Sequence, residues 1–153
     1  MASASIAMAQ TNGGSEKDQR EPVKKTLLEL FELSKSGRYP ESARFFIYRG
    51  TDEKRRDLDV YNFNDPEERR DIEEVAGEIK GMIWLSDSYE FSEYLEKVQT
   101  GRRVYIWRLI FKGGASQATI TFAFLKIKDR YAIFDIDGQS GYTRDLIKGM
   151  ENL

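Results

Sequence analysis

The sequence predicts an α+β fold in which N-terminal helices pack on a curved antiparallel β-sheet. Apolar residues recur at helical spacing in the first half of the chain, up to about Leu85. The second half carries β-branched and aromatic runs separated by Gly or Lys-Asp turns, a pattern typical of strands. These connections are too short for a parallel crossover, which needs about a dozen residues, so successive strands are expected to pair antiparallel.

The length of 153 residues fits one domain. Residues 1–21 are small and polar, which predicts a disordered N-terminal tail, and residues 22–153 are expected to form a single α+β domain. An Ala-x-Ala pattern ends at Ala9 but lacks a basic segment and a long apolar run. We therefore expect a cytoplasmic protein, and an exported, periplasmic one as the alternative if residues 1–9 are a truncated signal peptide.

Composition excludes several classes of function. The chain is 40% hydrophobic and 33% charged, as in a soluble globular protein, and its net charge of −2 favours neither nucleic acid nor an anionic membrane as a partner. The absence of Cys and His excludes thiol chemistry, His-based triads and nearly every zinc or copper site. No cofactor and no metal are expected.

The first helix is expected to begin at Pro22 and to end at Gly37, because Val23, Leu27 and Phe31 fall on one face. A short second helix follows from Pro40, with Ala43, Phe46 and Ile47 spaced to bury one side.

The segment from Arg49 to Asn64 is predicted to be a loop with one brief extended stretch near Val60. Its basic cluster at Lys54–Arg56 is interpreted as solvated loop, because acidic residues flank it. The third helix is predicted from the cap Asp65 to about Leu85.

Four strands are expected, in "SDSYEFSEYLEKVQTG", "RVYIWRLIFKGG", "SQATITFAFLKIK" and "RYAIFDIDG". Alternation along the second strand places one wholly apolar or aromatic set on a single face, which predicts that this face points inward: Tyr105, Trp107, Leu109 and Phe111. On the third strand the bulky inward set is Ile120, Phe122 and Phe124.

The stretch from Ala132 to Gly138 resembles the first motif of the haloacid dehalogenase phosphatases. The motif lies at the wrong end of the chain, since its Asp137 is only 16 residues before the last residue, and Gln139 replaces its usual threonine. A calcium loop starting at Asp135 fails as well, because Ser140 and Leu146 occupy the glycine and bidentate-acid positions. We interpret the stretch as a strand end. Beyond it, a short C-terminal helix is predicted from about Thr143.

Three helices followed by antiparallel strands resemble the nuclear transport factor 2-like superfamily, which includes the SnoaL-like cyclases and ketosteroid isomerases. The resemblance covers roughly Pro22 to Asp137, through "LLELFELSKSGRYPESARFF", "IEEVAGEIKGMI" and the closing strands. It implies a cone-like, cystatin-like topology in which the sheet wraps around the long helix and leaves a pocket at the mouth.

A noncatalytic small-molecule-binding or accessory domain with an aromatic-lined pocket is the function we expect, with a small apolar or aromatic ligand. The residues predicted to bind it are Tyr39, Tyr48, Trp84, Tyr105, Trp107, Phe122 and Phe124. The competing interpretation is that these aromatic side chains only fill the core.

Two alternatives remain open. The first is a homodimeric interaction module that pairs through the outer face of the sheet, at Val104, Ile106 and Ile110. The second is an isomerase or cyclase in which an Asp such as Asp135 moves a proton and a Tyr stabilises the enolate.

Overall fold

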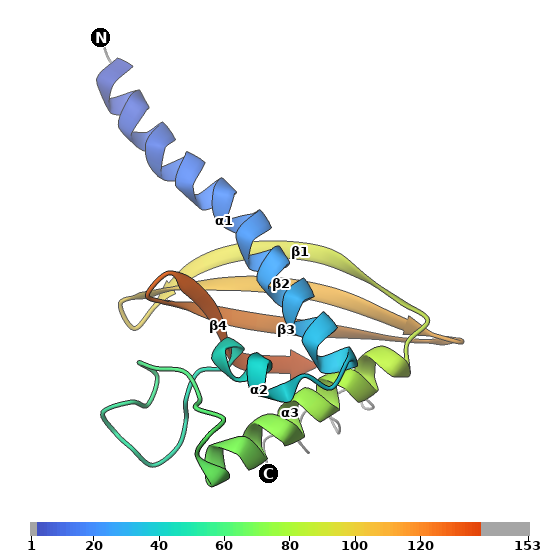
Figure 1. Ribbon diagram of the computed structural model, residues 1–153. Coiled ribbons are helices and arrows are strands. Elements are labelled where there is room, and N and C mark those ends of the chain that lie inside the picture. Colours follow the sequence, from blue (N-terminus) through green and yellow to red (C-terminus); the bar gives the residue numbers. More distant parts are fainter. Residues whose placement is uncertain (1–2, 139–153) are drawn as a thin grey trace.

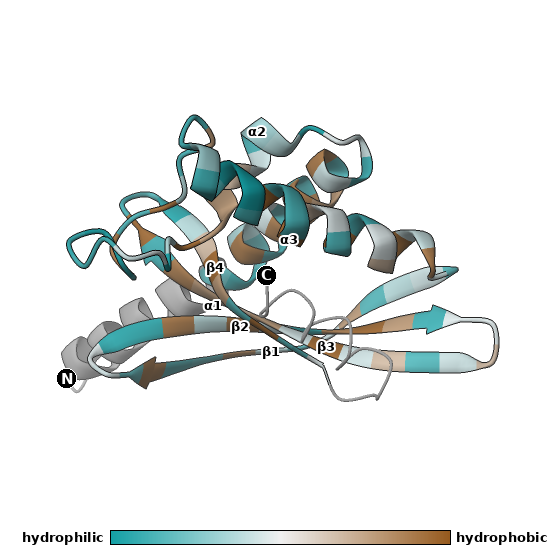
Figure 2. Ribbon diagram, turned by 90° about the horizontal axis from the view of Figure 1, so that it is seen from below, coloured by the Kyte–Doolittle hydropathy of each residue, from teal (hydrophilic) through white to brown (hydrophobic). Residues whose placement is uncertain are grey.

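The computed structural model describes residues 3–138, with side chains from residue 19 onward. The elements are α1 (Ser3–Lys35), α2 (Tyr39–Ser42), the 3-10 helix η1 (Ala43–Phe45), α3 (Pro66–Trp84), β1 (Ser88–Gln99), β2 (Arg102–Gly113), β3 (Ser116–Ile127) and β4 (Arg130–Gly138). The strands form one antiparallel sheet in the order β1-β2-β3-β4. In Figure 1, α1 crosses the strands and α3 lies beside it, and Figure 2 shows α2 and α3 on one side of the sheet. The α+β class and the antiparallel pairing are confirmed.

Helix α1 buries the apolar face that its sequence predicted, since Val23, Leu27 and Phe31 are fully buried. It ends before Gly37, whose φ of 73° is in the left-handed region that glycine adopts without strain. The helix includes Pro22, where it was expected to begin. The disorder of residues 1–21 stays a prediction, and the helix predicted from Thr143 lies outside the described residues.

The second helix is short, as predicted, but Phe46 and Ile47 lie beyond it. Phe46 bridges to Ile133 of β4, and Ile47 bridges to Val60. The amide of Ile47 donates to the carbonyl of Ile133 at 2.9 Å, so this stretch lies beside β4 through an isolated bridge. The extended stretch expected near Val60 is the partner of this bridge.

Asp65 caps α3 by accepting hydrogen bonds from the backbone amides of Glu67 and Glu68, as the sequence predicted. The side chain of Glu68 turns away from the cap and accepts from both terminal nitrogens of Arg55, at 2.9 and 3.0 Å. Arg55 also lies over the ring of Tyr48, 4.1 Å from its centroid. The interpretation of Lys54–Arg56 as solvated loop is therefore wrong for Arg55, which joins the loop to α3.

The inward face of the sheet packs against the helices in one core. The bulky sets predicted on β2 and β3 belong to it together with residues of α1 and α3: Tyr105, Trp107, Leu109, Phe111, Ile120, Phe122, Phe124, Leu27, Phe31, Ile72 and Ile79. The rings of Phe111 and Phe122 meet Phe31 edge-on, with centroids 6.2 and 5.8 Å away. The predicted inward faces of β2 and β3 are confirmed.

The opposite face of the sheet carries a second apolar cluster. Val104 and Ile106 of β2 pack there with Ala123 and Leu125 of β3 and with Ile47. Val104 is 2% exposed and Ile106 is 8% exposed. Two of the three residues that suggested a free dimerisation patch are therefore buried within the chain, and only Ile110 is half-exposed.

Two β-bulges change the alternation of side chains along the outer strands. Phe91 pairs with Leu109 and Glu93 with Arg108, which leaves Ser92 as an extra residue in β1. Likewise Ile133 pairs with Phe124 and Asp135 with Ala123, which leaves Phe134 as an extra residue in β4. An extra residue exchanges the two faces for every later residue of its strand.

Candidate functional site

The structure brings together four of the seven residues that were predicted to bind a ligand. Tyr105, Trp107, Phe122 and Phe124 all lie in the core on the inward face. Of the other three, Tyr39 packs against the same core, and Tyr48 is buried under Arg55. Trp84 is 74% exposed at the end of α3, where Lys80 lies over its ring.

The bulge at Ser92 turns two further side chains of β1 inward. Tyr94 pairs with Trp107 and Glu96 pairs with Tyr105, so both lie on the face that carries the core. Tyr131 of β4 reaches the same place, because its ring meets Tyr105 edge-on with centroids 5.2 Å apart. We call Tyr94, Glu96, Tyr105 and Tyr131 the tyrosine–glutamate cluster.

Hydrogen bonds hold the carboxylate of this cluster in place. The hydroxyl of Tyr94 donates to Oε2 of Glu96 at 2.6 Å, and Arg103 lies 3.4 Å from Oε1. The Glu96 side chain is only 8% exposed, whereas that of Arg103 is 41% exposed. A nearly buried carboxylate thus sits at one end of the apolar face.

Burial and the neighbouring charge change the acidity of the phenols. Burial raises the pKa of Tyr94, and its hydrogen bond to Glu96 raises it further. Burial raises the pKa of Tyr131 to about 12, with smaller contributions from Tyr105 and Glu96. Tyr94 and Tyr131 therefore stay protonated at neutral pH and can donate as well as accept hydrogen bonds.

Basic side chains lie over the aromatic rings at this end of the sheet. The guanidinium of Arg20 is 5.4 Å from the centroid of Tyr94, and Nζ of Lys24 is 4.8 Å from that of Phe91. Nζ of Lys126 is 5.6 Å from the centroid of Tyr131. All three distances are within the range of cation–π attraction. The indole nitrogen of Trp107 donates to the carbonyl of Arg20 at 3.2 Å, which ties this part of α1 to the sheet.

Asp135, the acid considered for an isomerase, is not on this face. It is exposed and pairs with Ala123, whose side chain lies in the second cluster. Plain alternation would have placed it with Tyr131 and Ile133, but the bulge at Phe134 turns it to the opposite face.

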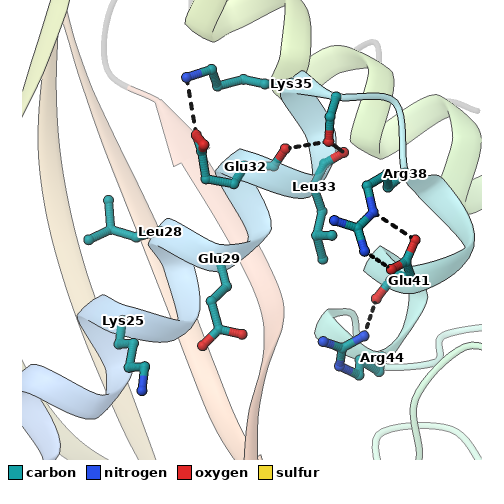
Figure 3. A pocket seen from close by; sticks show the side chains of 10 residues that line it. Lys25, Leu28, Glu29, Glu32, Leu33, Lys35, Arg38, Glu41 and Arg44 are labelled. Carbon is teal, nitrogen blue, oxygen red and sulfur yellow. Dashed lines mark hydrogen bonds and ion pairs between the residues drawn. The ribbon is translucent and has the colours of Figure 1, made fainter.

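A separate groove of about 720 Å³ runs along α1 and α2, between the residues drawn in Figure 3. Four of its charged side chains form ion pairs within the groove: Lys35 bonds Glu32 at 3.1 Å, and Arg38 pairs with Glu41. None of the seven predicted ligand-binding residues lines it. Paired surface charges of this kind stay hydrated and contribute little binding energy.

The spacing of apolar residues in the sequence indicates the bulges that form the tyrosine–glutamate cluster, although strict alternation does not predict them. Tyr89 and Phe91 are two residues apart, but the next ring, Tyr94, follows after three. On β4, Tyr131 and Ile133 are likewise followed after three residues by Ile136. A step from two to three in an apolar strand pattern marks the extra residue of a bulge.

Comparison with protein-family models, curated proteins and solved structures finds no match to this chain. Among the helices of residues 3–138, none is long and apolar enough to span a membrane.

Proposed function

We propose that this chain is a noncatalytic binding domain that holds a small, mainly apolar or aromatic ligand at the tyrosine–glutamate cluster. The observation that carries the proposal is the nearly buried carboxylate of Glu96, placed among three phenols at the edge of an aromatic face. Ligand sites typically combine an apolar wall with a few polar groups that fix orientation. At this cluster, the wall is provided by Trp107 and Phe91, whose rings meet edge-on with centroids 4.9 Å apart.

The order of elements supports a nuclear transport factor 2-like fold with a cone-like sheet as part of the proposal. The helices precede four antiparallel strands, and they pack on one face of the sheet. In such a fold the mouth of the cone is where a ligand enters, and the tyrosine–glutamate cluster lies at one end of the inward face.

The test uses Trp107 as the reporter, because it is one of two tryptophans and touches Tyr94 with ring centroids 5.2 Å apart. In a Trp84→Phe background, benzyl alcohol, benzylammonium and benzoate are titrated while Trp107 emission is followed. At least one compound should change the emission with a saturable dependence.

The affinity for that compound should weaken about tenfold in Tyr131→Leu, on β4, and persist in Tyr89→Leu, the same substitution near the start of β1 and away from the cluster. If neither these three compounds nor choline and its neutral analogue 3,3-dimethylbutan-1-ol change the emission, the proposed function is wrong. An equal loss of binding in both variants would place the ligand elsewhere.

A second candidate is proton transfer next to a carbonyl, with Glu96 as the base in place of Asp135. The Tyr94–Glu96 pair supports it, because the carboxylate can take the proton next to a carbonyl and return it to the same carbon, while a protonated phenol donates a hydrogen bond to the enolate oxygen. Deuterium exchange into cyclohexanone, followed by proton NMR, tests this candidate. Exchange above the buffer rate that disappears in Glu96→Gln would favour catalysis, and exchange at the buffer rate would exclude it for this ketone.

A further inference from the structure

From the arrangement around Glu96 we infer that the ligand carries an organic cation, such as a quaternary or primary ammonium group. The inference rests on the proposed binding function and names the chemical class of its ligand. The cation would lie against the rings of Tyr94 and Tyr131 with the carboxylate of Glu96 beside it.

The chain itself shows which groups these ring faces accept. Arg20 lies over Tyr94, and Lys126 lies over Tyr131. Both basic side chains are exposed, so each can move into water at little cost. They therefore stand where a ligand cation would bind, and a ligand that also buries apolar surface can displace them.

Glu96 supplies the charge that distinguishes a cation from a neutral ligand. Its side chain is 8% exposed and is fixed by Tyr94, while its ionic partner Arg103 is 3.4 Å away and 41% exposed. A cation that approaches this nearly buried carboxylate is attracted more strongly than one that approaches a hydrated carboxylate at the surface. An anion would face the repulsion of the same carboxylate.

Two matched pairs of compounds test the inference in the Trp84→Phe background. Choline is compared with 3,3-dimethylbutan-1-ol, its neutral carbon analogue, and benzylammonium is compared with benzyl alcohol. Each cation should bind at least tenfold more tightly than its neutral partner. Glu96→Gln should remove most of that preference, because it keeps the shape of the side chain and removes its charge.

Glu90→Gln is the control for the loss of charge, since Glu90 lies on the same strand, pairs with Ile110 and contacts Lys112 at 3.5 Å. It should leave the preference for cations unchanged. Arg20→Ala should strengthen choline binding severalfold, because it frees the ring face of Tyr94.

The outcomes separate this inference from the proposed function. Equal binding of cations and neutral analogues, or tighter binding of benzoate, would show that the ligand is not a cation. The proposed binding site would not be affected by that result. Unchanged choline affinity in Arg20→Ala would contradict the use of the Tyr94 face. Absence of any response from all five compounds would overturn both proposals.

Discussion

Tyr131 gives the stability of the fold a pH dependence at the scale of a single residue. Its pKa is raised to about 12 in the folded chain, mainly by burial, from an ordinary value of 10.0. The folded state thus holds the phenol proton more tightly than the unfolded state. The stability that this raised pKa contributes is fully present below pH 10 and is lost as the pH rises through about 12.

We expect the free energy of unfolding to fall more steeply between pH 10 and 12 in the parent than in Tyr131→Phe. Urea unfolding at a series of pH values measures this, and absorbance at 295 nm follows the ionisation of the phenols. Parallel curves for the two proteins over this range would contradict the raised pKa.

The ion pair of Arg55 and Glu68 is a second residue-scale feature, because it joins two segments 13 positions apart. Glu68 is 7% exposed and also accepts the amide of Asn62 at 2.7 Å. Arg55→Met should lower the free energy of unfolding by about 2 kcal/mol, since it leaves a nearly buried carboxylate with fewer partners.

Arg38→Met is the matched control, because Arg38 pairs with Glu41 at the surface, where both side chains are largely exposed. It should change stability little. Chemical denaturation of both variants makes the comparison, and equal losses would show that the Arg55 pair has no special role.

At the scale of elements, the end of α3 meets the end of β2 at Gly113. A Cβ added there would lie 2.8 Å from the carbonyl oxygen of Leu85. The amide of Asp87 donates to the carbonyl of Lys112 at 2.7 Å, and its carboxylate accepts from the amide of Gly114 at 2.9 Å, so the backbone cannot easily move away.

Gly113→Ala should therefore destabilise the protein by about 1–2 kcal/mol through overpacking. Gly81→Ala is the contrasting change, because Gly81 sits inside α3 and its added Cβ would meet no atom within 4 Å apart from the neighbouring backbone of its own helix. It should raise stability by up to about 1 kcal/mol through helix propensity. Melting temperatures that move in the same direction for both variants would show that the contact with Leu85 is not restrictive.

At the scale of the whole molecule, this one chain packs apolar residues on both faces of its sheet. Ile106 belongs to the second cluster and is 8% exposed, whereas Ile110 is half-exposed. A homodimer through the outer face stays a prediction, and Ile110→Glu is the variant that tests it.

Ile106→Glu should instead lower the melting temperature by about 10 °C at every protein concentration, because it places a charge in an apolar cluster. If the chain dimerises through this face, light scattering should show a lower mass for Ile110→Glu with its melting temperature nearly kept. A mass unaffected by Ile110→Glu would exclude this face as the interface. A concentration-dependent effect of Ile106→Glu would show that Ile106 contacts a second copy.

Local sequence determined the identity and order of the helices and strands. The cap at Asp65, the glycine after α1 and the short turns between strands act through neighbouring residues, so they can be interpreted without knowledge of the fold. The same holds for the inward faces of β2 and β3 along Tyr105–Phe111 and Ile120–Phe124, where alternation is unbroken.

Only the tertiary structure decided which side chains form the candidate site. The extra residues Ser92 and Phe134 are defined by pairing with other strands, and they turn Tyr94 and Glu96 inward while they turn Asp135 outward. The burial of Ile106 likewise depends on packing near Ile47, 59 positions away in the chain. Such contacts join distant segments, and their geometry follows from the twist and packing of the whole sheet, which local propensities do not contain.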